Sequence, residues 1–118
     1  PAEGLFNTDF YQSVFNALSD DGIVVAQSEG PLWAPEMVSE IFKALGAQFP
    51  VCEPYTFPVP TYPFGYWSFV FASKKYGSFD CFSQERAATL SKSTKYYNPE
   101  IHRAAFALPN FLKQHLQI

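Results

Sequence analysis

The sequence predicts an α/β fold, because segments with helical periodicity alternate with short segments that are typical of strands. The first strand candidate, Ile23-Val24-Val25-Ala26, is wholly apolar, which is the pattern of a parallel strand covered on both faces. The next two candidates, 51–57 and 66–72, are joined only by a loop, which predicts an antiparallel pair at a sheet edge. With 118 residues the chain can support one core, so residues 1–118 are expected to form one unit.

The first helix is expected to begin at Asn7 or Thr8, because either side chain can cap it and Asp9 then suits the helix dipole. The apolar residues that follow one another at helical spacing in this segment are Phe6, Phe10, Val14, Ala17 and Leu18. After a turn at 19–22, the strand 23–26 leads directly into the polar run 27–30. In open α/β sheets, ligands bind at the carboxyl ends of strands.

The second helix is expected to begin at Pro35-Glu36 and to end with Gly46 as its C-cap. Its predicted buried stripe consists of Met37, Ile41, Phe42 and Leu45. The strand that follows contains Pro54, which places this residue at a sheet edge or a bulge.

Three prolines stand in the segment between the last two strands, at 58, 60 and 63. Proline fixes φ and lacks an amide proton, so a rigid, extended loop is predicted there. The loop leads into an aromatic and β-branched strand at 66–72. Such a loop could hold the polar side chain of Tyr62 in a fixed place. Alternatively, Tyr62 packs with its hydroxyl at the surface, and the residues alone slightly favour this second interpretation.

Short helices are predicted for the C-terminal third. Ser83 can cap a helix to Leu90, Asn98-Pro99-Glu100 opens a helix to about Ala104, and Pro109 begins the last one. The order helix, strand, helix, strand, strand matches the C-terminal half of a Rossmann-like sheet of the class I methyltransferase type. We therefore expect that half-sheet, ending in an antiparallel strand pair and short C-terminal helices.

The composition limits the function classes that fit this chain. Aromatic residues make up 19% and charged residues only 16% of the chain, against about 25% charged in a typical domain. We expect more apolar surface than the fold hides, covered by missing sequence or by partner subunits. The net charge of −3 and the lack of a basic run exclude nucleic acid as a partner. Without a long apolar run or a signal peptide, a soluble, cytoplasmic protein with no membrane partner is expected.

The sequence lacks the residues that most standard catalytic and metal sites need. Cys52 and Cys81 are too few for a disulfide framework and are interpreted as small apolar packing residues. His102 and His115 have no spacing suited to a metal, so no metal site is predicted, and no glycine-rich phosphate loop occurs. What remains is a set of hydrogen-bonding side chains, Gln27, Glu29 and Tyr62, which could hold a protonated amine. Ordinary loop polarity explains these residues too, and the residues alone favour that explanation.

Four ordered blocks of the sequence resemble the spermidine synthases, the polyamine aminopropyltransferases. The first two are Leu5-Phe6 with Asp9-Phe10-Tyr11, and the run Gly22 to Glu29. The third is Pro60-Thr61-Tyr62-Pro63 with Gly65, Trp67, Phe69 and Ala72-Ser73-Lys74. The fourth is Lys95-Tyr96-Tyr97-Asn98 with 101–109. The resemblance covers essentially the whole chain.

The resemblance implies a reaction and its site residues. The family transfers the aminopropyl group of decarboxylated S-adenosylmethionine, its co-substrate, to putrescine and releases spermidine and methylthioadenosine. No other cofactor is implied. At the family's amine-binding positions this chain has Gln27, Glu29 and Tyr62, and along the adenine and thioether side it has Pro1, Ala2 and Leu5. The resemblance also implies a homodimer or homotetramer.

The chain departs from the family pattern in two ways, and each departure predicts a difference in function. Phe64 stands where a small residue, often serine or glycine, is common, so the ring could narrow or reshape the diamine channel and change the amine preference. The family's cofactor loop, ribose ligand and catalytic aspartate all precede the position that corresponds to Pro1. No catalytic residue is therefore assigned in this chain, which is expected to be inactive by itself. A spermine or thermospermine synthase, or a non-catalytic scaffold that binds a partner protein, stays open as an alternative.

Overall fold

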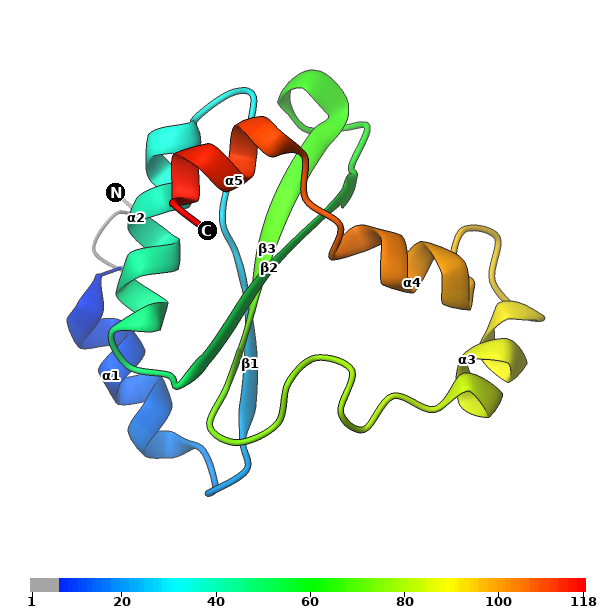
Figure 1. The fold of residues 1–118 in the computed structure, drawn as a ribbon, viewed down its shortest axis with the longest axis horizontal. Helices are drawn as coiled ribbons and strands as arrows, with labels where there is room; N and C mark the ends of the chain where they lie inside the picture. The colour runs from blue at the N-terminus through cyan, green and yellow to red at the C-terminus, as the bar shows by residue number, and fades with distance from the viewer. Residues whose placement is uncertain (1–6) are drawn as a thin grey trace.

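The computed structural model of the protein describes residues 7–118 and confirms the predicted α/β architecture. Within this part of the chain the sheet has the strand order β1-β3-β2, and both pairings are antiparallel. Helices α1, α2 and α5 lie at one side of the sheet, and α3 and α4 lie at the other (Figure 1). The elements in chain order are α1 (Thr8–Ala17), β1 (Ile23–Gln27), α2 (Pro35–Gly46), β2 (Val51–Pro58), β3 (Tyr66–Ser73), α3 (Gln84–Ser91), α4 (Pro99–Ala105) and α5 (Asn110–Leu116).

The expectation of a parallel, doubly covered strand is wrong for β1. Its strand partner among the described residues is β3, which runs antiparallel to it with Val25 opposite Phe71. Exposure alternates along β1, and Ile23 and Val25 are 47% and 51% exposed. An apolar run does not fix the direction of the neighbouring strand, and one face of this run lies outside the core. The predicted antiparallel pair of β2 and β3 is confirmed, and Pro54 lies in the edge strand β2.

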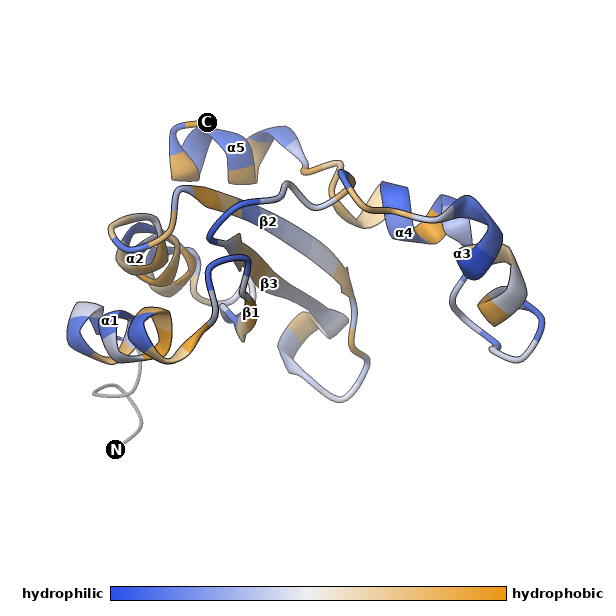
Figure 2. Ribbon diagram, turned by 90° about the horizontal axis from the view of Figure 1, so that it is seen from below, coloured by the Kyte–Doolittle hydropathy of each residue, from blue (hydrophilic) through white to orange (hydrophobic). Residues whose placement is uncertain are grey.

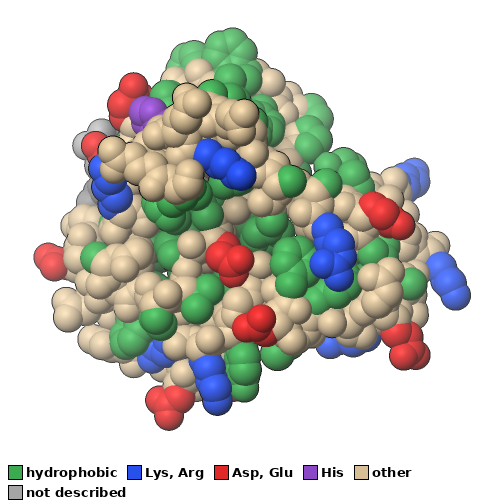
Figure 3. All heavy atoms as spheres, in the orientation of Figure 1, with side chains coloured by type: hydrophobic (Ala, Val, Ile, Leu, Met, Phe, Trp, Pro, Cys, Tyr) green, Lys and Arg blue, Asp and Glu red, His purple; other side chains and the backbone are tan. Residues whose placement is uncertain are grey.

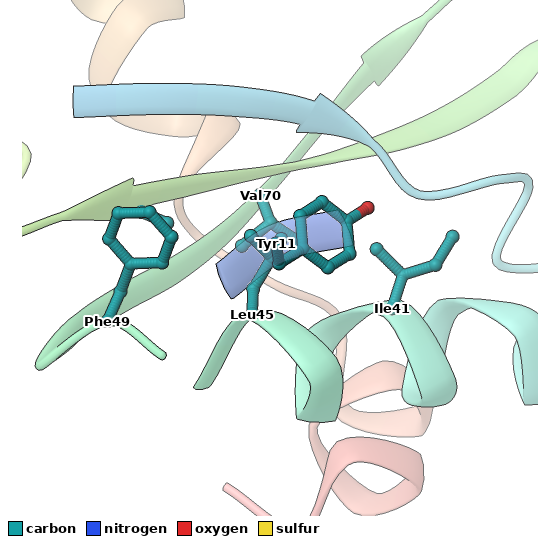
Figure 4. Packing of buried hydrophobic residues seen from close by; sticks show 6 residues of the cluster. Tyr11, Ile41, Leu45, Phe49 and Val70 are labelled. Carbon is teal, nitrogen blue, oxygen red and sulfur yellow. The ribbon is translucent and has the colours of Figure 1, made fainter. Parts of the chain in front are cut away.

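The main hydrophobic core lies between the sheet and the helices α1 and α2 (Figure 4). Val70 and Ala72 point into it from β3, as side chains two residues apart on a strand do. Val24 and Ala26 of β1 and Cys52 of β2 pack around it, so all three strands contribute. The fully buried members are Tyr11, Ile41, Leu45, Phe49, Val70 and Ala72.

Helix α1 begins as predicted, and Val14 and Leu18 of its predicted stripe pack at the core, whereas Phe6 lies outside the described residues. The Asn7 side chain caps it by accepting a hydrogen bond of 2.8 Å from the Phe10 amide. The predicted stripe contained Phe10, which is 40% exposed, and omitted Tyr11, which is 2% exposed. Tyr11 packs with Val14, Phe15 and Leu18, a spacing of i, i+3, i+4 and i+7 on one helix face. Adjacent aromatic residues made the two stripes hard to separate from sequence.

Helix α2 starts at Pro35 as predicted and buries Ile41 and Leu45. The prediction missed Val38, which is fully buried because it packs against Leu112 and Leu116 of α5. Gly46 is the last residue of the helix and not its C-cap. That position belongs to Ala47, which keeps a right-handed conformation.

The predicted starts of the short C-terminal helices are confirmed. Ser83 caps α3 by accepting from the Arg86 amide, Asn98 caps α4 by accepting from the Ile101 amide, and Pro109 precedes α5. In Figure 2, α3 and α4 lie at the end of the molecule opposite α1 and α2. No helix within 7–118 combines the length and the apolar character that a bilayer crossing requires.

The second face of the sheet carries a layer of aromatic side chains. Phe57 stacks on Phe69 with ring centroids 4.6 Å apart, and Tyr55 lies 5.3 Å from Phe69 and 4.8 Å from Phe106. Hydrophobic side chains reach the surface at several places on the face seen in Figure 3, as the aromatic composition predicts.

Of the two cysteines, Cys52 packs at the core as predicted, whereas Cys81 is exposed and is not a packing residue.

The proline-containing connection between β2 and β3 is folded back on itself and is less extended than predicted. Val59 donates to the Gly65 carbonyl at 2.9 Å, and Gly65 donates to the Tyr62 carbonyl at 2.8 Å. The chain turns between them because Phe64 and Gly65 both have left-handed backbones, with φ of 62° and 66°. Glycine adopts this conformation freely, whereas a residue with a Cβ is strained in it.

Replacing Phe64 by glycine is therefore expected to stabilise the protein by up to about 1 kcal/mol, because the strain is relieved at the cost of some unfolded-state entropy. The free energy of unfolding in urea measures this. Phe64→Ala is the matched control, since it removes the ring but keeps the Cβ and the strain. A glycine variant that is less stable than the alanine variant would contradict the strain argument.

Candidate functional site

A cavity of about 470 Å³ lies along the edge of β1 that is not paired with β3. It receives side chains from both faces of this edge, from α1 and from the chain segment that follows β1. Two of the residues predicted to bind an amine, Gln27 and Glu29, line it. The full lining consists of Phe10, Tyr11, Val14, Val24, Val25, Ala26, Gln27, Glu29, Ile41 and Trp67.

Glu29 supplies the negative charge of this cavity. It is half-buried and has a left-handed backbone with a φ of 73°. Its carbonyl oxygen accepts two hydrogen bonds from Ser68, one from the amide at 2.9 Å and one from the hydroxyl at 2.7 Å. The backbone of Glu29 is thus fixed to β3, and Glu29 is one of the residues that line the cavity.

Gln27 is held in place by Trp67. The indole Nε1 donates to the Gln27 side-chain oxygen at 3.2 Å. An amide oxygen has two lone pairs, so one remains for a ligand donor. Trp67 is 7% exposed, and its ring also forms part of the cavity wall. The sequence marked Trp67 only as part of a motif, and the structure places it between the predicted site residues.

Tyr62, the third predicted residue, lies beside the cavity and not in its lining. Its ring contacts that of Trp67 with centroids 4.3 Å apart, and it is 37% exposed. The indole therefore connects Tyr62 to Gln27. This contact agrees with the interpretation of Tyr62 as a packing residue, and it also places Tyr62 near the cavity.

Tyr11 is a site residue that the sequence interpretation missed. Its hydroxyl is buried, and within residues 7–118 it has no hydrogen-bond partner. Figure 4 shows this hydroxyl pointing in the direction in which β1 runs, and Tyr11 lines the same cavity as Glu29. Burial raises the pKa of Tyr11 to about 12, so the phenol stays neutral at physiological pH. Tyr11 looked like an ordinary helix residue, and only its burial distinguishes it.

The expectation that Phe64 narrows the ligand channel is not supported by its position. The ring is 69% exposed and packs on Trp33 at 5.9 Å, and Phe64 is not part of the cavity lining. Close packing near the site occurs at Gly30 instead. A Cβ on Gly30 would lie 3.2 Å from the Trp67 ring and from the Trp33 Cβ. The lack of a side chain at Gly30 allows the indole to lie against the backbone that follows Glu29.

A second cavity, of about 450 Å³, opens on the aromatic face of the sheet. Its polar side chains include the pair formed by Tyr97 and His102, whose hydroxyl and Nδ1 are 2.7 Å apart. Burial, with a smaller contribution from Arg103, lowers the pKa of His102, which favours a neutral imidazole. Among the described residues that line this cavity there is no carboxylate, in contrast to the cavity beside β1.

Other predicted positions give no further site. Pro1, Ala2 and Leu5, predicted along the nucleoside side, lie outside the described residues. Within 7–118, His, Cys, Asp and Glu form no group of three that could hold a metal ion. The described site thus consists of one carboxylate, one amide, two phenols and an indole.

Comparisons with known proteins agree on one family. The model of the Spermine/spermidine synthase domain matches residues 1–85. The chain is 47% identical to a polyamine aminopropyltransferase of Methanocaldococcus jannaschii and 43% identical to one of Clostridium kluyveri, over 96% and 95% of its length. It spans about 40% of the length of each of these relatives.

Solved structures give the same result for the fold. The crystal structure of spermidine synthase from Thermotoga maritima superposes with a TM-score of 0.92 at 38% identity, over 99% of this chain and 40% of that one. A spermidine synthase in complex with the transition state analogue AdoDATO gives a TM-score of 0.91 at 37% identity, over 98% of this chain and 40% of that one.

The Trp67→Phe variant tests the role of the indole. It keeps an aromatic ring beside Tyr62 but loses the hydrogen bond to Gln27, so a loss of about 1–2 kcal/mol in the free energy of unfolding is expected. Trp33→Phe is the matched control, because Trp33 is 61% exposed, and it is expected to change the stability by less than about 0.5 kcal/mol. Equal losses in chemical denaturation of the two variants would argue against a specific role of Trp67.

Proposed function

Because this chain belongs to the spermine/spermidine synthase family, we propose that it forms the amine-binding part of an aminopropyltransferase. The proposed donor is decarboxylated S-adenosylmethionine and the proposed acceptor is putrescine. The observation that carries the proposal is the placement of Glu29 and Gln27 in one cavity. The indole of Trp67 forms part of the wall of this cavity and donates a hydrogen bond to Gln27.

The chemistry of the cavity fits a diamine. Putrescine has two amino groups joined by an apolar chain, and the cavity offers hydrogen-bond acceptors beside apolar walls. The Glu29 carboxylate can pair with an ammonium group, and the Gln27 oxygen and the Tyr11 phenol can accept from an amine. Phe10, Val25 and Trp67 supply apolar surface for the methylene chain. The described lining contains no Lys or Arg to repel a cation.

In the proposed reaction the neutral nitrogen of the acceptor attacks the carbon next to the sulfonium. A nitrogen–carbon bond forms as the carbon–sulfur bond breaks, methylthioadenosine leaves with the electron pair, and the nitrogen then loses a proton. The sulfonium is already a good leaving group, so the protein contributes deprotonation and alignment. The residues of the β1-edge cavity would align the acceptor by holding its distal ammonium group.

The cavity does not distinguish between acceptor amines of different length, so putrescine is proposed and a longer amine is the alternative. A spermine or thermospermine synthase would bind a longer amine by the same charge and the same apolar contacts. The cavity is open along the β1 edge and has room for either. The exposed apolar side chains support an assembly with further protein surface, in which case a homodimer or homotetramer is proposed.

The test of the proposed function is an assay of methylthioadenosine release with the natural protein that carries this sequence. Decarboxylated S-adenosylmethionine is supplied with putrescine, spermidine or no amine. We expect release that depends on the amine and is highest with putrescine. If saturating putrescine neither supports release nor raises the melting temperature, the chain serves as a scaffold and the proposal is wrong.

The Glu29→Gln variant tests the charge in the cavity. It keeps the shape of the side chain but loses a charge-assisted hydrogen bond, so the KM for putrescine is expected to rise about 10- to 100-fold. Glu40→Gln is the matched control, since Glu40 lies exposed on α2 away from the cavity, and its KM should stay unchanged. A KM for putrescine that is equal in both variants would remove Glu29 from the amine site.

The Tyr62→Phe variant tests the phenol beside Trp67. We expect weaker use of putrescine, about threefold or more in kcat/KM, because the hydroxyl is lost, and little change in stability, because the ring contact is kept. Tyr96→Phe, at an exposed position on the other side of the sheet, is the control. Rates at limiting putrescine and melting temperatures are compared, and an unchanged rate would exclude Tyr62.

A further inference from the structure

Two buried serines connect to the backbone of Glu29, the acidic residue of the proposed amine site. Ser28 and Ser68 are both fully buried, on the segment after β1 and on β3, and their hydroxyl oxygens are 2.7 Å apart. We propose that Ser68, supported by Ser28, is a positioning residue that fixes Glu29 for binding the amine. This inference rests on the proposed function, since it concerns the same site.

The hydrogen bonds around these serines have a defined direction. The Ser68 hydroxyl donates to the Glu29 carbonyl oxygen at 2.7 Å, so its only proton is used there. The hydroxyl of Ser28 must then be the donor in the contact between the two serines. The result is a chain from Ser28 to Ser68 to the Glu29 carbonyl, and hydrogen bonds in such a chain polarise and strengthen one another.

Backbone hydrogen bonds connect the same three residues. The Ser28 amide donates to the Ser68 carbonyl at 2.9 Å, and the Ser68 amide donates to the Glu29 carbonyl at 2.9 Å. The Glu29 carbonyl therefore accepts two hydrogen bonds, both from Ser68. Within residues 7–118, these are the last hydrogen bonds between the segment after β1 and β3 before the chain turns toward α2.

The need for this arrangement follows from the conformation of Glu29. Its φ of 73° lies in the left-handed region, which is strained for a residue with a Cβ. Without compensation, Glu29 would relax toward a negative φ, and its carboxylate would point elsewhere. The two hydrogen bonds to its carbonyl oppose this relaxation. The buried serine hydroxyls thus act on the direction of a charged side chain that they do not touch.

A purely structural role of the serine pair makes a different prediction. Two hydroxyls that only satisfied each other inside the core would affect the stability of the protein and nothing else. A positioning role requires that the loss of the Ser68 hydroxyl weakens amine binding, and that this effect disappears when Glu29 has no carboxylate.

The test is a double-mutant cycle on the KM for putrescine in the natural protein, with the variants Ser68→Ala, Glu29→Ala and their combination. Alanine at position 29 keeps the Cβ and hence the strain. Ser68→Ala alone is expected to raise the KM about tenfold, the equivalent of one hydrogen bond. In the Glu29→Ala background the same change should alter the KM by less than about twofold. Ser28→Ala, which leaves the bond from Ser68 to Glu29, should give an intermediate increase.

Ser73→Ala is the matched control for a lost buried hydroxyl. Ser73 is fully buried on the same strand, and its hydroxyl accepts from the amides of Lys75 and Tyr76, away from the cavity. It should lower the melting temperature without changing the KM. A Ser68→Ala effect on KM that is equal in both backgrounds, or a loss of melting temperature alone, overturns the inference. An inactive wild-type protein would instead overturn the proposed function, and with it any role of Ser68 in amine binding.

Discussion

The site depends on the central strand β3, to which Gln27, Glu29 and Tyr62 are each connected. Within residues 7–118, β3 is the strand with partners on both edges. Its Trp67 holds Gln27, its Ser68 holds the backbone of Glu29, and Tyr62 packs on Trp67 from the turn that precedes the strand. Val70 and Ala72 of the same strand point into the core, on the same face as Ser68 and on the face opposite Trp67. The packing that stabilises the fold therefore also sets the positions of the site residues.

The cavity lies beside β1 and receives side chains from both faces of this strand. Val24 and Ala26 pack at the core on one face, and Ile23 and Val25 are exposed on the other. Gln27 ends the strand and Glu29 follows it, so the apolar residues of β1 lie next to one amide and one carboxylic acid residue.

Sequence alone was sufficient for most elements and for part of the site. Helix starts could be predicted because capping is local: Asn7, Ser83 and Asn98 each bond an amide three residues ahead. The partner of β1 could not, because pairing depends on distant residues. For the same reason Val38 was missed, since α5 buries it. Gln27 and Glu29 were candidates because they come at the end of a strand, but only the family resemblance favoured them over ordinary loop polarity. Tyr11 and Ser68 acquire their environments only from tertiary contacts.

Two residues with strained backbones near the site differ in the contacts that hold them in this conformation. Glu29 and Phe64 both have left-handed backbones. Glu29 is held there by two hydrogen bonds to its carbonyl and by a buried serine pair, and its side chain lines the cavity. Phe64 is mostly exposed and contributes a ring contact with Trp33. Strain that the surrounding structure actively maintains marks a position whose geometry matters. By this criterion we propose that the backbone conformation of Glu29 matters for the proposed site, whereas that of Phe64 belongs to the turn before β3.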